Sequence, residues 1–148
     1  MKRIIVLLAF MLISIPVFAQ RINVPKKVKN SFTKLYPKAV EVEWSKENET
    51  EFEAGFKQDG KGMSVVLDKE GNVKETETAL ESSGLPVNVM PYINKNYAGC
   101  EITETAKIIS ASGEVKYEVE VTDGKKHKDI LFDKNGSPIK KEKKNEKD

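Results

Sequence analysis

The most constraining feature of this 148-residue chain is an internal repeat. Pro25 and Tyr36 recur as Pro86 and Tyr97, and the separation is 61 positions in both cases. The apolar residues between each proline and its tyrosine also recur at matching positions. Similarity at a fixed separation predicts a fold in which one supersecondary unit occurs twice.

The later part of each copy supports the same prediction. Phe52 recurs as Tyr117, and Asp68 recurs as Asp133. In each copy 16 positions separate the aromatic residue from the aspartate. The distance from the leading proline to the aromatic residue is 27 positions in the first copy and 31 in the second. The extra residues fall in the connection between two expected strands, where loops accept insertions. A duplicated structure therefore explains the spacing better than chance does.

Each copy begins with a segment of helical spacing, predicted at 24–36 and 86–97. In the first segment the residues of one face are apolar, at Val28, Phe32 and Leu35. Asn23 is placed to cap this helix, and Pro37 is placed to end it because a proline disfavours helical geometry in the residue before it.

After each helix the apolar residues alternate with polar ones, which predicts strands with one buried and one wet face. The first copy has three clear runs, at 40–45, 51–56 and 63–67, and a weaker fourth that begins at Val73. The strands expected in the second copy lie at 102–109, 115–121, 128–132 and 137–140. We therefore predict an α+β fold of two tandem helix-plus-four-strand antiparallel repeats, with the helices packed on one face of the sheet or sheets.

The two copies, at 24–80 and 85–140, are expected to form a single domain at 20–141. A copy of about 60 residues buries too little surface to be stable alone. We therefore expect the two sheets to join or abut and to share one hydrophobic interior. The highly charged end, 142–148, is predicted to be disordered.

The first 19 residues have the pattern of a signal peptide. Lys2 and Arg3 precede a short apolar run, and Ala19 suits cleavage before Gln20. An uncleaved N-terminal anchor is the alternative. Cleavage predicts a periplasmic or secreted protein without stable membrane insertion.

The charge balance bears on the class of partner. Without Lys2 and Arg3 the 25 basic side chains fall to 23, which equals the number of acidic ones. A neutral exported protein has no electrostatic reason to bind nucleic acid, so we predict no nucleic-acid partner.

Few residues suggest catalysis or metal binding. His127 is the only histidine and Cys100 the only cysteine. We expect His127 in an exposed hairpin loop and Cys100 as a small buried residue, with a reactive thiol or an intermolecular bridge as the alternative for Cys100. One histidine and one cysteine cannot complete a structural zinc site of four side chains, and no nucleophile has a recognisable base. The prediction is a protein that is no enzyme, with no catalytic, cofactor-binding or metal residues.

Two acidic turns, at 68–72 and 133–136, resemble calcium loops in composition. Calcium needs about six or more oxygen ligands, often with a bidentate glutamate at a fixed distance. A strand end followed by a glycine turn explains both segments without a metal. A small-ligand or calcium-responsive periplasmic protein is the alternative function.

Strand alternation separates an aromatic face from a polar one. Five aromatic residues are expected to face the helices and belong to the core. The alternative is that they line a binding surface. They are Trp44, Phe52, Phe56, Tyr117 and Phe132. The candidate partner-binding residues lie on the opposite face: Glu41, Glu43, Glu51, Glu53, Lys116, Glu118 and Glu120. This face is either simply solvated or an uncovered sheet that receives a protein, a peptide or a cationic ligand.

Residues spread over the whole exported chain resemble a known pattern: Val24, Pro25, Phe32, 36–39, Trp44, 52–54, Asp68, Gly71, Leu85, Pro86, Tyr97, 117–120, Phe132, Asp133 and Gly136. The chain resembles the PepSY-like, beta-lactamase-inhibitor-like family of exported Bacteroidetes proteins. It departs from the pattern at Ala98, which stands where the first copy has Pro37.

The resemblance implies helix-then-sheet repeats, export, and inhibitory or binding roles, since related domains occur in protease propeptides and in inhibitors of beta-lactamase. It supplies no catalytic residue, and likeness of fold is a poor guide to activity. The resulting prediction is an exported non-enzymatic binding module, inhibitory if the resemblance extends that far, whose open sheet face and hairpin loops bind an unknown protein or peptide.

Overall fold

The structure is a computed structural model that describes residues 22–139. The predicted signal peptide and the predicted charged tail lie outside the described residues. The elements follow one another in this order: α1 (Lys26–Leu35), β1 (Val40–Lys46), β2 (Glu51–Gln58), β3 (Lys61–Asp68), β4 (Val73–Ala79), the short 3-10 helix η1 (Ser82–Gly84), α2 (Val89–Asn96), β5 (Glu101–Ser110), β6 (Val115–Thr122) and β7 (His127–Asp133).

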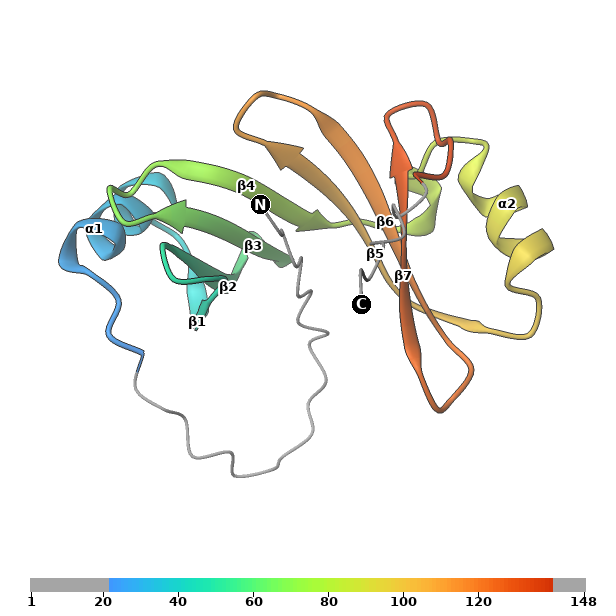
Figure 1. The fold of residues 1–148 in the computed structure, drawn as a ribbon, viewed down its shortest axis with the longest axis horizontal. Helices are drawn as coiled ribbons and strands as arrows, with labels where there is room; N and C mark the ends of the chain where they lie inside the picture. The colour runs from blue at the N-terminus through green and yellow to red at the C-terminus, as the bar shows by residue number, and fades with distance from the viewer. Residues whose placement is uncertain (1–21, 140–148) are drawn as a thin grey trace, which may run out of the picture. The chain divides into compact units, whose positions relative to one another are not determined.

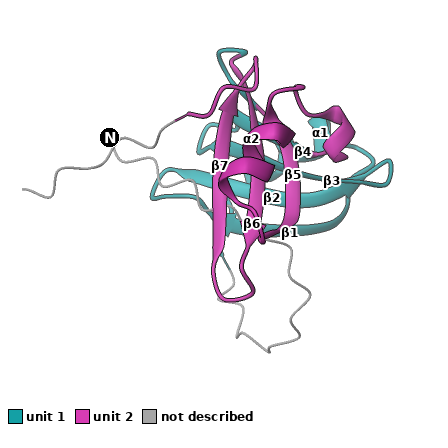
Figure 2. Ribbon diagram, turned by 90° about the vertical axis from the view of Figure 1, so that its right-hand side faces the viewer, with its two compact units in different colours: residues 1–78, 109–113 teal, residues 79–108, 114–148 magenta. Residues whose placement is uncertain are grey.

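The strand order in the sheet follows the chain from β1 to β7 (Figure 1). The pairings of β1 with β2, β2 with β3, β3 with β4 and β6 with β7 are antiparallel. The predicted α+β class is therefore confirmed. The chain divides into two compact units, residues 1–78 with 109–113 and residues 79–108 with 114–148, which Figure 2 colours separately.

The second unit differs from the prediction after β7. The fourth strand expected at 137–140 is reduced to one isolated bridge between Phe132 and Pro138. A proline has no amide hydrogen to donate to a ladder, so this segment cannot pair as the equivalent β4 does. The backbone N–H of Ile139 still donates to the carbonyl of Leu131.

Both helices begin later than their patterns predict. The residue before α1 is Pro25, and no side chain caps this end, so the predicted cap by Asn23 is wrong. Proline suits this position because the first amides of a helix have no partner within the helix. Before α2, residues 86–88 form a turn in which the N–H of Val89 donates to the carbonyl of Pro86.

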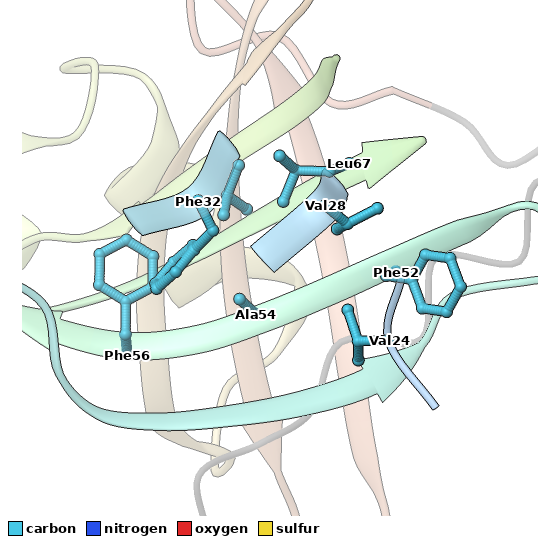
Figure 3. Close-up of a cluster of buried hydrophobic side chains, with 8 residues drawn as sticks. Val24, Val28, Phe32, Phe52, Ala54, Phe56 and Leu67 are labelled. Carbon is cyan, nitrogen blue, oxygen red and sulfur yellow. The ribbon is translucent and has the colours of Figure 1, made fainter. Parts of the chain in front are cut away.

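The core of the first unit forms where α1 covers β2 and β3. Val28 and Phe32 project from the helix toward the strands (Figure 3). The ring of Phe32 meets the edges of Trp44 and Phe56, at centroid distances of 5.2 and 5.1 Å. Tilted and edge-to-face rings are favoured over flat stacking, so this cluster fixes α1 against the strands.

The core of the second unit is mainly aliphatic. Its buried members are Leu85, Val89, Ile93, Val119, Val121, Ile130 and Phe132. Each unit thus has its own cluster of buried apolar residues, where the sequence predicted one common interior. The assignment of aromatic residues to the core is confirmed for Phe52, Phe56 and Phe132, which are buried, while Trp44 and Tyr117 are partly buried.

In each unit the turn after the third strand packs closely against the helical segment. Gly71 has φ +82° and Gly136 has φ +80°, a region that residues with a Cβ rarely adopt. A Cβ at Gly71 would overlap the hydroxyl of Ser31 on α1, and one at Gly136 would lie 2.9 Å from the Cβ of Pro86. The repeated glycines therefore permit both the turn and its contact with the helical segment.

Candidate functional site

The seven residues predicted to form a polar face lie on three strands. They are Glu41 and Glu43 on β1, Glu51 and Glu53 on β2, and Lys116, Glu118 and Glu120 on β6. The first four belong to the first unit and the last three to the second. Only Glu41 and Glu43 are exposed, while Glu51 and Lys116 are half-buried.

The other three predicted face residues are buried, contrary to the expectation of an uncovered face at these positions. Their exposed fractions are 8% for Glu53, 2% for Glu118 and 5% for Glu120. A carboxylate tolerates burial only with hydrogen bonds or opposite charge around it. In the first unit, the hydroxyl of Ser45 donates to Glu53 at 3.2 Å.

In the second unit a polar network surrounds Glu120. One oxygen of this carboxylate lies 2.9 Å from Nδ1 of His127 and also accepts a hydrogen bond from the Thr103 hydroxyl. The network joins β5, β6 and β7 across the sheet. Partial burial, and next the charges of Glu120 and Asp129, raise the pKa of Glu104. Negative charge is thus concentrated around Glu120.

The geometry around His127 does not form a nucleophile–base pair. Catalysis of that kind needs a hydroxyl or thiol that gives its proton to the histidine. Here the Thr103 hydroxyl donates to Glu120 instead. The exposure expected of His127 is confirmed, but its placement in a loop is wrong, because it is the first residue of β7 and pairs with Thr122.

A second concentration of negative charge lies near the start of β2. Partial burial, and next the charges of Glu53, Glu51 and Glu75, raise the pKa of Glu47. The nearby Glu51 carboxylate accepts a hydrogen bond from the amide of Asn48 at 2.5 Å. Both units therefore carry an acidic region.

Strand β1 exposes both apolar and acidic side chains. Val40 is 56% exposed and Val42 is 37% exposed, and Glu41 and Glu43 are exposed beside them. In the part of the chain that the structure describes, β1 pairs with β2 alone, at the end of the strand order. The register shifts between Val40 and Glu43, and Glu41 has φ +53°. A bulge of this kind disturbs the ladder at an edge and redirects side chains.

The two acidic turns are held by their own backbone. One oxygen of Asp68 accepts from the N–H groups of Glu70 and Asn72, at 3.0 and 2.9 Å. Asp133 accepts in the same way from Asn135 and Ser137, at 2.8 and 2.9 Å. These contacts support the interpretation of both segments as turns. Within residues 22–139 no group of three or more histidine, cysteine or acidic residues is placed to hold a metal ion.

Cys100 is half-buried, so the prediction of a buried residue is wrong. It follows the end of α2 directly before β5, where its N–H donates to the carbonyl of Tyr97 at 3.0 Å. The side chain is packed only in part against the core of the second unit. The residue is therefore only partly shielded from solvent.

The sequence interpretation missed Thr103, Glu104 and the contact between His127 and Glu120. A signal was available for the last contact, because His127 is the first strand residue after the Asp123–Lys126 turn and Glu120 lies two residues before Thr122. Diagonal neighbours on one face of an antiparallel pair are within reach of long side chains. The exact register of the hairpin was needed to apply this rule.

Comparison with solved structures supports the fold. A crystal structure of a DUF2874 family protein from Bacteroides uniformis has a TM-score of 0.67 and 23% identity, covering 78% of this chain and 86% of that one. A structure from Bacteroides eggerthii, described as "putative periplasmic proteins", has a TM-score of 0.69 and 16% identity, covering 79% and 86%. A BLIP-like protein from Bacteroides fragilis has a TM-score of 0.60 and 24% identity, covering 78% and 84%.

No curated protein matches the chain. Among the described residues no helix is both long enough and apolar enough to cross a membrane. One family model, described as "Putative beta-lactamase-inhibitor-like, PepSY-like", matches the chain twice, at residues 18–75 and 58–140. The two matches favour the hypothesis of tandem repeats. Together they span most of the sequence, and the chain belongs to the PepSY-like, beta-lactamase-inhibitor-like family.

Proposed function

We propose that this protein is an exported, non-enzymatic binding module that contacts a partner protein or peptide through β1. The predicted polar face enters this proposal through its exposed members, Glu41 and Glu43. The buried members, such as Glu118 and Glu120, are not accessible to a partner, and Glu120 instead links β5, β6 and β7 through Thr103 and His127. A periplasmic location accords with the description of the Bacteroides eggerthii neighbour.

The observation that carries the proposal is the composition of the exposed surface of β1. Two exposed valines alternate with two exposed glutamates, and an edge strand offers them without a neighbour on its outer side among the described residues. Apolar side chains at the centre of a contact with charged groups around them are typical of protein interfaces. The bulge between Val40 and Glu43 favours contact through side chains over addition of a partner strand.

The charge of this surface indicates the chemistry of the partner. Glu41 already attracts one lysine, with Nζ of Lys57 at 2.6 Å from its carboxylate. A partner with basic side chains beside an apolar one would complement β1, since complementary charge speeds and orients association. The family description as inhibitor-like suggests an enzyme as one class of partner.

Site-specific photo-crosslinking tests the proposal. A benzophenone amino acid replaces Val40 on β1 or, as the control, Val87, which is 85% exposed and lies in the second unit. We expect Val40 to yield a discrete adduct in the envelope fraction of the source bacterium, and Val87 to yield none. The same adduct from both positions, or none from position 40, would contradict the proposal.

A charge-reversal pair sharpens this test. Glu41→Lys with Glu43→Lys should reduce the adduct from position 40, while Glu70→Lys with Glu81→Lys makes the same change of net charge at exposed positions that are not part of β1. Equal loss in both double variants would point to a general effect of charge and not to a site on β1. An enzyme recovered in the adduct is then assayed with and without the protein, because an inhibitory role predicts loss of its activity.

A further inference from the structure

A second surface, distinct from β1, lies entirely in the second unit. A hollow of about 300 Å³ is lined by residues from the end of α2 and from the hairpin of β6 and β7. Its lining includes Tyr97 and Cys100 from the α2 side and Val121 from β6. The hairpin supplies Asp123, Lys126, His127 and Lys128.

The floor of the hollow is apolar. Val121 is only 2% exposed, and the Tyr97 ring and the Cys100 thiol are half-buried beside it. A concave apolar floor is the usual element of a site that receives a side chain. The volume of about 300 Å³ is at the lower end of the range for small-ligand pockets, and it also accommodates one apolar side chain of a larger partner.

The rim of the hollow is basic. Lys126 and Lys128 line the hollow and are exposed, and Nζ of Lys128 lies 4.8 Å from the centre of the Tyr97 ring. This cation–π contact keeps the ammonium group beside the opening. The rim therefore presents positive charge next to an apolar floor.

Two acidic residues of the hairpin, Asp123 and Glu120, lie near this rim and are hydrogen-bonded within the protein. The Asp123 carboxylate accepts from the N–H groups of Lys125 and Lys126, both at 2.9 Å, and so faces the loop backbone. The Glu120 carboxylate is buried and is bound by His127 and Thr103. Both acids are thus engaged within the protein, while the lysine side chains reach into solvent.

We propose that this hollow is a docking site for an acidic peptide segment of a partner protein. An apolar side chain of the segment rests on Val121 and Tyr97, and flanking carboxylates meet Lys126 and Lys128. The inference goes beyond the proposed function because it uses other residues and another partner chemistry. A negative result for the surface of β1 would not affect this proposal, and a negative result for the hollow would not affect the proposed function.

The single cysteine provides a direct test, since alkylation of Cys100 by iodoacetamide reports on access to the hollow in the full exported chain. The probes are acidic heptapeptides of glutamate and aspartate with Phe, Leu or Ala at the centre, and matched peptides in which glutamine replaces every acid. We expect the Phe and Leu peptides to slow alkylation several-fold, the Ala peptide to slow it less, and the glutamine peptides to have no effect. Equal protection by inorganic polyphosphate or heparin would overturn the proposal, because it would show general binding of anions.

Charge reversal at the rim completes the test. Lys126→Glu with Lys128→Glu should weaken the protective peptides by about ten-fold, the loss expected for two exposed ion pairs. Lys29→Glu with Lys34→Glu makes the same change of net charge on exposed residues of α1 and should leave protection intact. The proposal is wrong if the peptides still protect Cys100 in the Lys126/Lys128 variant. It is also wrong if protection is lost equally in both double variants. Amide chemical shifts of the wild-type protein give a second readout, in which the shifts must move at Tyr97–Cys100 and at the hairpin.

Discussion

The two units perform the same structural task with different cores. Each has a helix covering antiparallel strands and a glycine turn, at Asp68–Gly71 or Asp133–Gly136, that packs against the helical segment. The first unit is filled by interlocking rings, with Tyr36 and Phe56 at 4.6 Å between centroids. The second is filled mainly by aliphatic residues, with one edge contact between Tyr92 and Phe132 at 5.5 Å. Different apolar residues can therefore fill the two cores, provided that their total volume and their spacing along the chain are suitable. The turns are more restrictive, because their backbone conformation accepts few residue types.

The polar residues differ more than the cores do. In the first unit Glu53 is bound by a serine hydroxyl, whereas in the second unit Glu120 is bound by a threonine and a histidine. The first unit exposes an acidic and apolar strand, and the second exposes a basic hairpin. Equivalent scaffolds therefore carry surfaces of opposite charge, which is why the two proposed sites have partners of opposite chemistry.

The largest expected effect compares the two cores directly. Phe56→Ala and Phe132→Ala each remove a ring that is at most 1% exposed, and each should lower the free energy of unfolding by about 3–5 kcal/mol. Urea denaturation of both variants measures this, with Val87→Ala as an exposed control. A loss below about 1 kcal/mol for either variant would show that the corresponding core relaxes around the cavity. The two cores would then not contribute equally to stability.

An intermediate effect is expected at the turn glycines. Gly136→Ala should cost about 2–3 kcal/mol, because it combines a positive φ with a contact against the rigid ring of Pro86. Gly71→Ala should cost less, since the Ser31 side chain it meets can rotate. Gly60→Ala and Gly124→Ala are matched controls with positive φ and open space around the new Cβ, at about 1 kcal/mol each.

The glycine prediction has an internal check. Ser31→Ala removes the hydroxyl that the new Cβ at position 71 would meet, so the double variant should recover part of the loss. Equal costs at all four glycines would show that backbone conformation alone matters and that the helix contacts contribute nothing.

The smallest effect concerns the acidic regions and depends on pH. Burial and neighbouring carboxylates raise the pKa of Glu104, so its ionised form costs stability in the folded protein. The cost is absent well below the pKa of a glutamate in the unfolded chain, about 4.3, grows as the pH rises from there to the folded pKa, and stays constant above it. Glu104→Gln should therefore stabilise the protein at pH 7, by less than about 1 kcal/mol since the side chain is partly exposed, and not at pH 3.

Glu47→Gln gives the matching measurement in the first unit, where the pKa of Glu47 is raised in the same direction. Thermal unfolding at pH 3 and pH 7 compares both variants with Glu81→Gln, which removes an exposed charge. Stabilisation by Glu104→Gln that is equal at the two pH values would show that ionisation of Glu104 is not the cause.

The sequence alone determined the local structure of this protein. A change of period from helical to alternating placed α1 and the strands to within a few residues. Glycines that follow a polar residue, as in Asp59–Gly60 and Asn135–Gly136, placed the turns. Both features depend on neighbouring residues. The bridge at Pro138 was also open to prediction from the missing amide of proline, although the alternating pattern outweighed it.

The tertiary structure alone decided which polar residues are buried. Glu41 and Glu120 have the same place in an alternating pattern, yet one is exposed and the other is 5% exposed and bound to His127 and Thr103. The division into two cores and the hollow beside Cys100 likewise depend on contacts between residues far apart in the chain. Burial of a polar group depends on what packs over it and which partners satisfy it, and strand periodicity contains neither.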